Sequence, residues 1–371
     1  MRILIAPDKF KGTLSAPAAA EAIASRLEVL QKDWTILRCP LADGGEGTLN
    51  SVLPVEGTLV EASVMDARGR SLEVAFGRFP SGPTDTILIE SASCLGLSLL
   101  PPSLRDPEKA SSFGLGLILR EALRYPTGRI VLALGGVATV DGGLGFLQAL
   151  GTRFETSSGP LPLQASASAM AGITAADLNP ALIALQGTSL EAWCDVFSPL
   201  LGPIGAARMF GPQKGAAPEA VERLELGMSS FASVLEKSTG RPLSGLPGAG
   251  AAGGLGLAIA ALGGYLKPGF ASVAEAVALE EKIRLSDIII TGEGRLDAST
   301  RQGKAPWGVL ETARHLGKPC YAIAGSIADA SGGWTGTVSL FQGDVEPDDP
   351  RLRNLGPVLD DAVRRLVLMI R

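Results

Sequence analysis

The chain has 371 residues, of which 46% are hydrophobic and 19% are charged, and its formal net charge is −5. This composition is that of a globular protein and excludes a disordered chain, and the length favours two domains over one. Because the charge is acidic and no basic face or arginine-rich tail is apparent, we expect no nucleic-acid partner.

Cysteine and histidine usage excludes further kinds of site. The four cysteines are scattered, so we expect reduced thiols in a cytoplasmic protein and no structural zinc. The single histidine, His315, excludes a histidine-based metal site and leaves acid–base chemistry to Asp, Glu or Lys. The chain starts on a strand pattern and its long uncharged segment 247–266 is rich in glycine, so we expect neither a signal peptide nor a membrane span.

The N-terminal segment predicts the start of a parallel sheet. Residues 2–6 and 35–39 have the apolar pattern of strands, and 16–30 has that of a helix whose start is marked by Ser15. The glycine-rich turn 43–46 is expected to open a second helix. This alternation of strands and helices is typical of parallel α/β sheets.

The pattern then changes to short alternating segments at 58–64, 72–78 and 86–90, separated by Gly, Pro and Asp. These predict antiparallel strands of a different domain. A buried strand is expected at 129–134. Amphipathic helices are predicted for 217–237 and 270–284.

The alternation of predicted strands and helices seen at the N-terminus recurs at the end of the chain. The predicted elements there are a strand at 287–291, a helix at 305–316, strands at 319–324 and 337–341, and a helix at 357–370. We therefore expect an α/β protein with a Rossmann-like, doubly wound parallel-sheet domain formed by 1–56 and 284–371. A second α/β domain with a mixed sheet, 57–283, is expected as an insertion, with the active site in the cleft between them. A division into two consecutive halves is the alternative.

Charged, glycine-rich segments follow several predicted strands. The richest is Thr291-Gly-Glu-Gly-Arg-Leu-Asp297 with Lys304 beyond it, which we interpret as a turn leaving the 287–291 strand. Ligands of open α/β sheets bind beyond the carboxyl ends of the strands, so these charges mark a candidate site for an anionic ligand. A local ion pair between Glu293 and Arg295 that only holds the turn is the alternative.

Two similar turns lie near the N-terminus. Pro7-Asp-Lys-Phe-Lys-Gly12 offers Lys9 and Lys11 to a carboxylate or phosphate, and it could equally be a solvated loop. In the segment 41–48, Asp43 and Glu46 have the spacing of a helix N-cap and its partner, and capping alone could explain both. The three glycines of this segment would equally let a ligand approach the backbone closely, which capping does not require.

A third turn, Gly135–Gly145, connects a buried strand to a helix. Such a turn presents free N–H groups to phosphate, which favours phosphate binding by Gly135, Gly136 and Thr139, while Asp141 could bind Mg²⁺ or cap the helix. A fourth segment carries Asp195 and Lys214, and there a structural role is as plausible as a functional one.

Six segments together resemble the bacterial glycerate kinase family, in its type I group that forms 2-phosphoglycerate. They are Asp8-Lys-Phe-Lys-Gly-Thr-Leu-Ser15, Ala42-Asp-Gly-Gly-Glu-Gly-Thr48, Gly135–Gly143, Phe210-Gly-Pro-Gln-Lys-Gly-Ala216, Gly248–Gly256 and Thr291-Gly-Glu-Gly-Arg-Leu-Asp297. The resemblance spans nearly the whole chain. It implies a Rossmann-like domain with a second α/β domain, ATP as phosphoryl donor and D-glycerate as acceptor.

The leading hypothesis is an ATP- and Mg²⁺-dependent kinase that converts D-glycerate to 2-phosphoglycerate, with a homodimer left open. We expect catalytic roles for Asp297, Glu293, Lys304 and Asp43, substrate binding by Asp8, Lys9, Lys11, Glu46 and Arg295, phosphate or nucleotide binding by Gly135, Gly136, Thr139 and Lys214, and metal binding by Asp141 and Asp195. The main alternative is a non-catalytic binding or sensor protein for small hydroxy acids. A nicotinamide dehydrogenase is a weaker alternative, since the glycine pattern at 248–253 follows no predicted strand.

Overall fold

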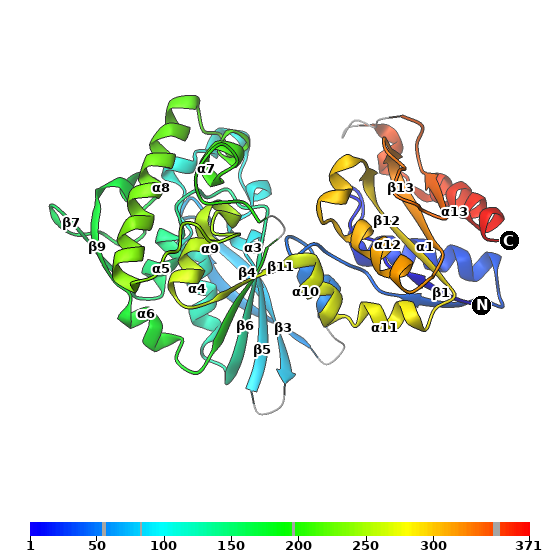
Figure 1. Cartoon of the computed structure of the whole chain (residues 1–371), viewed down its shortest axis with the longest axis horizontal. Helices are drawn as coiled ribbons and strands as arrows, with labels where there is room; N and C mark the ends of the chain where they lie inside the picture. Colours follow the sequence, from blue (N-terminus) through cyan, green and yellow to red (C-terminus); the bar gives the residue numbers. More distant parts are fainter. Residues whose placement is uncertain (54–56, 82–83, 195–196, 344–348) are drawn as a thin grey trace. The chain divides into compact units, whose positions relative to one another are not determined.

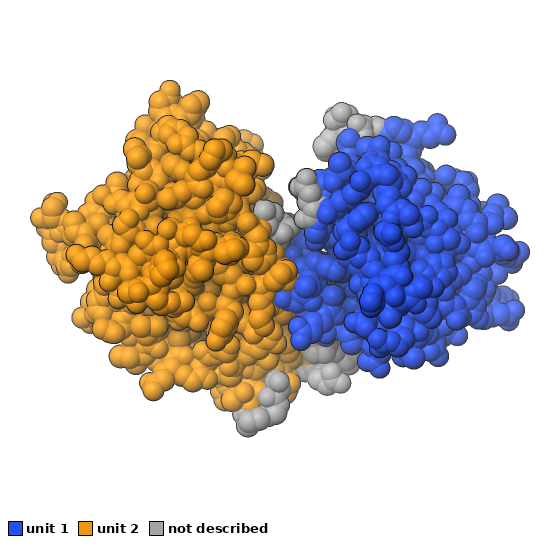
Figure 2. Space-filling model, viewed as in Figure 1, with its two compact units in different colours: residues 1–43, 50–52, 270–371 blue, residues 44–49, 53–269 orange. Residues whose placement is uncertain are grey.

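The computed structural model describes residues 1–53, 57–81, 84–194, 197–343 and 349–371, whose path is traced in Figure 1. The chain forms two compact units, coloured separately in Figure 2. Unit 1 comprises Met1–Asp43, Asn50–Val52 and Phe270–Arg371, and unit 2 comprises Gly44–Leu49 and Leu53–Gly269. Unit 1 thus contains both ends of the chain, and each unit has its own sheet and hydrophobic core.

Unit 1 is built on a five-stranded sheet in the order β14-β13-β12-β1-β2, in which every neighbouring pair is parallel. Its strands are β1 (Arg2–Ile5), β2 (Thr35–Arg38), β12 (Ile288–Leu296), β13 (Cys320–Ile327) and β14 (Gly336–Ser339). Counted within the unit, the order is 2-1-3-4-5, which is that of a flavodoxin-like doubly wound sheet. The predicted parallel-sheet class is therefore confirmed for this unit.

Helices cover both faces of this sheet because its strands are apolar on both sides. Ile3 and Ile290 join a core with residues of α1 and α13, whereas the neighbouring residues Leu4 and Ile289 are buried on the opposite face by strand alternation. Figure 1 shows α13 beside α1, and Arg26 pairs with Asp360 across them at 2.6 Å. The helices are α1 (Ala16–Leu30), α10 (Gly269–Ala276), α11 (Leu279–Arg284), α12 (Ala305–His315) and α13 (Gly356–Ile370), with 3₁₀ turns η6 (Ala298–Gln302) and η7 (Pro350–Arg353).

Helix ends in unit 1 agree with the sequence at one place and differ at another. The Ser15 hydroxyl accepts a hydrogen bond from Ala18 N and caps α1, as the sequence predicts. The single helix predicted for 270–284 is instead two helices, because Ala278 has a φ of +51° and ends one before the other begins.

Unit 2 is built on a mixed six-stranded sheet in the order β11-β10-β6-β5-β4-β3. The strands are β3 (Thr58–Met65), β4 (Ser71–Ser81), β5 (Thr84–Glu90), β6 (Thr127–Leu134), β10 (Ser189–Cys194) and β11 (Tyr265–Pro268). Strands β3, β4 and β5 pair antiparallel, as predicted, and β5 then pairs in parallel with β6. A small antiparallel sheet is formed by β7 (Arg153–Thr156), β8 (Gly159–Pro160) and β9 (Ile173–Asp177).

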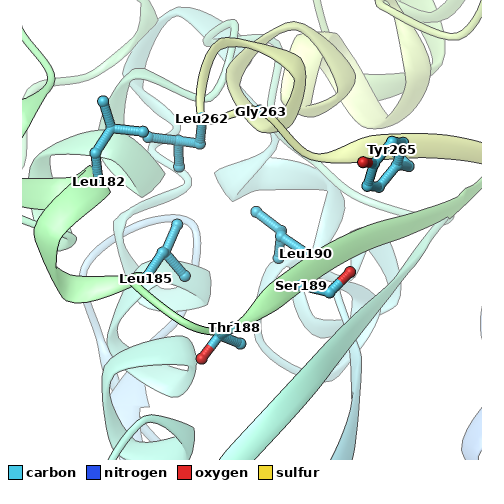
Figure 3. A pocket seen from close by; sticks show the side chains of 8 residues that line it. All are labelled: Leu182, Leu185, Thr188, Ser189, Leu190, Leu262, Gly263 and Tyr265. Carbon is cyan, nitrogen blue, oxygen red and sulfur yellow. The ribbon is translucent and has the colours of Figure 1, made fainter.

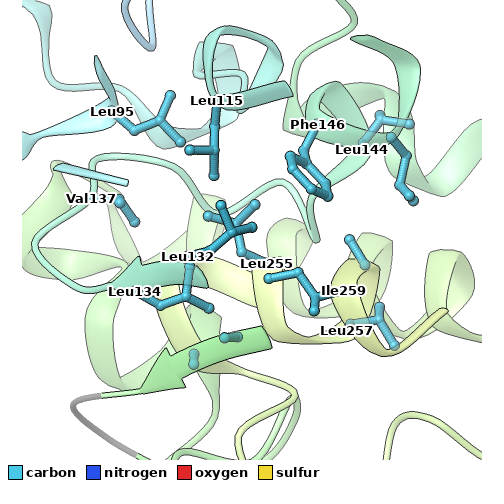
Figure 4. Close-up of a cluster of buried hydrophobic side chains, with 14 of the residues drawn as sticks. Leu95, Leu115, Leu132, Leu134, Val137, Leu144, Phe146, Leu255, Leu257 and Ile259 are labelled. Carbon is cyan, nitrogen blue, oxygen red and sulfur yellow. The ribbon is translucent and has the colours of Figure 1, made fainter. Parts of the chain in front are cut away.

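The core of unit 2 lies between this sheet and helices. Figure 4 shows Leu132 and Leu134 of β6 packed with Leu115, Phe146 and Leu255. The helices are α2 (Thr48–Val52), α3 (Ala92–Leu95), α4 (Phe113–Ala122), α5 (Leu144–Ala149), α6 (Asn179–Ala184), α7 (Ala206–Phe210), α8 (Pro218–Thr239) and α9 (Ala251–Ala261), with 3₁₀ turns η1 (Leu97–Leu99), η2 (Pro102–Leu104), η3 (Pro107–Lys109), η4 (Ala167–Gly172) and η5 (Pro212–Lys214). Within the described ranges, none of the helices is long and apolar enough to cross a membrane.

The first residues of α9 are glycine-rich and pack directly against the turn that follows β6. Three consecutive residues, 252–254, have positive φ. A Cβ atom on Gly253 would lie 2.0 Å from Thr139 O, and one on Gly254 would lie 2.7 Å from Gly142 Cα. Glycine is therefore required at 253 and 254 because two backbones touch there, which explains this part of the glycine pattern without a dinucleotide.

Candidate functional site

The site in unit 1 is placed by its strand order. Strand β1 is flanked by β2 on one side and β12 on the other. The strand order therefore runs from β1 to β2 on one side and from β12 to β13 and β14 on the other, which makes the position between β1 and β12 the switch point of the sheet. In doubly wound sheets the ligand binds outside the carboxyl ends of the strands at this switch point. The segments that follow β1 and lie at the end of β12 carry Asp8, Glu293 and Asp297.

Asp8 is a buried carboxylate beside the end of β12. Its backbone N–H donates to Gly292 O at 2.8 Å, which continues the pairing of β1 and β12 and fixes where the side chain starts. One carboxylate oxygen accepts a hydrogen bond from Lys9 N at 2.6 Å, and the residue is 5% exposed. Burial, followed by the negative charge of Asp43, raises the pKa of Asp8 to about 7.

Glu293 lies within β12 and is held by two partners that follow in the chain. Thr300 Oγ1 donates to its carboxylate at 2.6 Å, and Lys304 Nζ lies 3.6 Å from the other oxygen. Burial raises the pKa of Glu293, and the bond from Thr300 and the charge of Lys304 oppose that rise. The predicted grouping of Glu293 with Lys304 is thus present, whereas Thr300 is a partner that the sequence reasoning missed.

Asp297 has a different setting from that predicted for a base. Its carboxylate accepts hydrogen bonds from Ser299 N at 2.8 Å and Ser299 Oγ at 2.6 Å, and Thr300 Oγ1 accepts one from Asp297 N at 3.1 Å. This is a capping box that starts the 3₁₀ turn η6. The bond from the Ser299 hydroxyl lowers the pKa of Asp297, and Arg295 Nε lies 3.3 Å from its carboxylate. Arg295 thus forms an ion pair with Asp297, whereas Glu293 pairs with Lys304. Among the described residues, the alternative ion pair between Glu293 and Arg295 is not formed.

Residues 291–296 are strand and not the glycine-rich turn that the sequence suggested, because β12 runs to Leu296 and pairs with β13 along that length. Glu293 is therefore fixed by sheet pairing, whereas Asp297 lies just beyond the strand. Asp43, which follows β2, is half-buried and close enough to raise the pKa of Asp8. Lys9 is half-buried and Lys11 exposed.

Helix capping does not explain Asp43 and Glu46. Helix α2 begins only at Thr48, with Gly47 as its N-cap residue, so Asp43 lies too far upstream to cap it. Glu46 belongs to unit 2 and is exposed. The predicted second helix is only the short segment Thr48–Val52, and no capping role remains for these two carboxylates there.

In unit 2, the turn after β6 is organised by Asp141. Its carboxylate accepts four hydrogen bonds, from Ser112 N, Ser112 Oγ, Gly143 N and Gly145 N at 2.7 to 3.2 Å, and the residue is fully buried. Burial raises the pKa of Asp141, and these bonds counteract the rise. An oxygen that is occupied in this way is a poor ligand for Mg²⁺, so the geometry favours a structural role over the predicted metal binding.

Lys214 is hydrogen-bonded to the same turn. It is 4% exposed, and its Nζ donates to Thr139 O at 2.8 Å. Burial lowers the pKa of Lys214 to about 8, and the nearby charge of Asp141 opposes the shift. Thr139 is fully buried and its hydroxyl lacks a partner within the described structure. Gly136 is exposed, whereas Gly135 is half-buried and its N–H donates to Ser91 Oγ at 3.3 Å, so Gly136 is the more accessible of the two in the predicted phosphate turn.

Some predicted positions lie elsewhere. Asp195 falls outside the described residues. Across the described ranges, no group of three or more His, Cys, Asp or Glu side chains could hold a metal ion. A hollow of about 290 Å³ is lined by Leu182, Ser189, Leu262 and Tyr265 among others (Figure 3). It lies at the amino ends of β10 and β11, the opposite edge from that where α/β sheets bind ligands.

Comparison with known proteins gives a consistent result. A model of the glycerate kinase family matches residues 3–367. The chain is 39% identical over 331 residues to a glycerate kinase from Haemophilus influenzae, covering 89% of this chain and 87% of the relative. It is 37% identical over 334 residues to the glycerate 2-kinase of Escherichia coli, covering 90% and 87%.

A solved structure matches the whole fold. The crystal structure of a protein assigned as glycerate kinase 2 from Salmonella typhimurium LT2 superposes with a TM-score of 0.86 at 35% identity. The match covers 100% of this chain and 98% of that one.

Proposed function

Because the chain belongs to the glycerate kinase family, we propose that it transfers the γ-phosphoryl group of ATP to the 2-hydroxyl of D-glycerate, giving 2-phosphoglycerate and ADP. Membership makes it an enzyme of the kinase class. The observation that supports the reaction best is the buried pair Asp8 and Glu293 at the switch point of the unit 1 sheet, with Lys304 beside Glu293.

The acceptor is assigned to unit 1. Glycerate carries one carboxylate and two hydroxyls, so its site needs a cation and hydrogen-bond acceptors. Arg295 and Lys11 are exposed cations near the buried carboxylates, and Arg295 can grip a carboxylate with two parallel hydrogen bonds. Asp8 and Glu293 supply the acceptors for hydroxyl protons. Lys304 neutralises part of the negative charge there.

We assign the donor to unit 2, where the exposed Gly136 follows a buried strand and its half-buried neighbour Gly135 is held by a hydrogen bond from its N–H to Ser91 Oγ. Lys214 fixes this turn through Thr139 O and does not reach solvent, so we assign it to positioning the turn. Magnesium would accompany the phosphates of the nucleotide, as is usual in kinases. Asp141 does not fit a resident metal, since its oxygens are occupied by four hydrogen bonds.

The test is a coupled assay of ADP release from ATP and Mg²⁺ with D-glycerate, L-glycerate, glycolate and no acceptor. We expect release that depends on D-glycerate, and a phosphorus NMR spectrum of the product that shows the 2-phosphate. A 3-phosphate signal would overturn the choice of hydroxyl. Binding of glycerate or ATP without turnover would favour the non-catalytic sensor.

A further inference from the structure

We propose that the carboxylate of Asp8 is the general base that takes the proton of the acceptor hydroxyl during phosphoryl transfer. This inference rests on the proposed function. In the step, the hydroxyl oxygen forms a bond to the γ-phosphorus while the bond from that phosphorus to the β,γ-bridging oxygen breaks. ADP leaves with the electron pair, and the hydroxyl proton passes to Asp8 and then to solvent.

Among the carboxylates near the switch point, Asp8, Asp297 and Glu293 lie in or directly after β1 and β12, and their partners separate them. Asp297 is committed to the capping box of η6 through its two bonds from Ser299. Glu293 accepts a hydrogen bond from Thr300 and faces the cation of Lys304, and both contacts stabilise its charged form. Asp297 is therefore held as a weak base, and the carboxylate of Glu293, whose pKa burial raises, is already engaged by Thr300 and Lys304.

Asp8 has the opposite surroundings. The charged groups that act on it are Asp43 after β2, Glu293 in β12 and Lys9 in its own loop, and two of these three are negative. It is 5% exposed, so its charge is poorly solvated. Protonation of a carboxylate in such a place is favourable. The pKa of Asp8, raised to about 7, lies close to neutral pH, where general bases work best.

The backbone fixes Asp8 where a base is needed. The bonds Ala6 N to Ile290 O at 2.7 Å and Asp8 N to Gly292 O at 2.8 Å carry the β1–β12 pairing past the end of β1. Thr291 Oγ1 also donates to Ala6 O at 2.7 Å. The start of the Asp8 side chain is thus tied to the central strands of the sheet, at the edge where ligands of this fold bind.

The first experiment compares the pH dependence of kcat in the wild type and in Asp8→Asn, Asp297→Asn and Asp43→Asn. We expect the wild-type kcat to rise with pH through about 7 and then level off. Asp8→Asn should lower kcat by about 10²- to 10⁴-fold, with little change in the dissociation constants of glycerate and ATP. It should also remove the rise of kcat with pH below about 7, which we call the acidic limb. Asp297→Asn should keep the limb, and Asp43→Asn should move it to lower pH because a like charge is gone.

Several results would overturn the proposal. They are a wild-type kcat in Asp8→Asn, an acidic limb that persists in that variant, or a limb that disappears in Asp297→Asn instead. If Asp8→Asn does not fold, an unmoved limb in Asp43→Asn rejects the role of Asp8.

A second measurement does not depend on turnover. In protein labelled with ¹³C at the Asp carboxyls, one signal should titrate near pH 7 and be missing in Asp8→Asn. A titration of Asp8 below about pH 5, in the normal range for Asp, rejects the base. Failure of the proposed function has a different signature, which is wild-type protein that releases no ADP with D-glycerate whatever the NMR titration shows.

Discussion

The raised pKa of Asp8 predicts that this residue destabilises the fold at neutral and alkaline pH. In an unfolded chain an Asp ionises near pH 3.9, whereas in the fold Asp8 ionises near pH 7. Between these values the folded protein holds a proton that the unfolded chain has released, so stability falls as the pH rises through this window. Asp8→Asn keeps an oxygen that can accept the bond from Lys9 N and removes the charge.

The size of the effect follows from the shift. The pKa moves from 3.8 to about 7, and each unit corresponds to 1.36 kcal/mol, so ionising Asp8 costs the fold on the order of 4 kcal/mol at pH 8. Asp8→Asn should therefore be more stable than the wild type at pH 8 by a few kcal/mol, and about equal to it near pH 4. Urea unfolding followed by tryptophan fluorescence measures both, since Trp34, Trp307 and Trp334 all lie in unit 1.

Asp297→Asn is the matched control, because it makes the same chemical change in the same unit. The bond from Ser299 lowers the pKa of Asp297, so its contribution to stability is present above the unfolded pKa and is lost as the pH falls through the folded one. This variant should be less stable than the wild type at pH 8, with the gap closing in acid. Equal changes in the two variants at pH 8, or a loss of stability in Asp8→Asn that does not vary with pH, would refute the reasoning.

Three further predictions concern unit 2. Gly253→Ala should lower the free energy of unfolding by more than Gly263→Ala, because both have positive φ but only the first places a Cβ 2.0 Å from Thr139 O; equal thermal shifts contradict this. Lys214→Met should lower the free energy of unfolding in urea by about 1–3 kcal/mol, since it removes the buried hydrogen bond to Thr139 O. An unchanged unfolding midpoint would show that this hydrogen bond does not stabilise the turn. Gly136→Val should weaken ATP binding in calorimetry while the circular dichroism spectrum is kept, and unchanged affinity removes this turn from the nucleotide site.

The fold class could be predicted because the buried strands have a simple signature. Segments such as Ile3–Ile5 and Ile288–Ile290 are apolar at successive positions. This pattern is typical of strands in a sheet that is covered on both faces. Helix ends were predictable where a side chain caps them, as Ser15 does for α1. The break at Ala278 was not, because a left-handed alanine has no sequence signal.

The candidate residues in unit 1 could be predicted by type and place, but not their partners. Asp8, Glu293 and Asp297 all follow or end predicted strands, and that position marked them together with the family resemblance. Which of them is held as a cap and which is left among other carboxylates depends on the fold. The spacing of Asp297 and Thr300 is that of a capping box, and it could have signalled the capping contact of Asp297 in advance.

Glycine caused the main misinterpretation, and the reason is physical. The glycines of 291–297 suggested a turn open to a ligand, yet a Cβ on Gly292 would lie 2.1 Å from Ile323 O. A Cβ on Gly325 would lie 2.4 Å from Gly294 O. The absence of side chains here allows β12 and β13 to run close together up to their carboxyl ends, so that Glu293 projects from a rigid strand. A glycine-rich segment after an apolar run is thus consistent with either a flexible phosphate turn or tightly packed strands, and only the neighbouring strand decides between them.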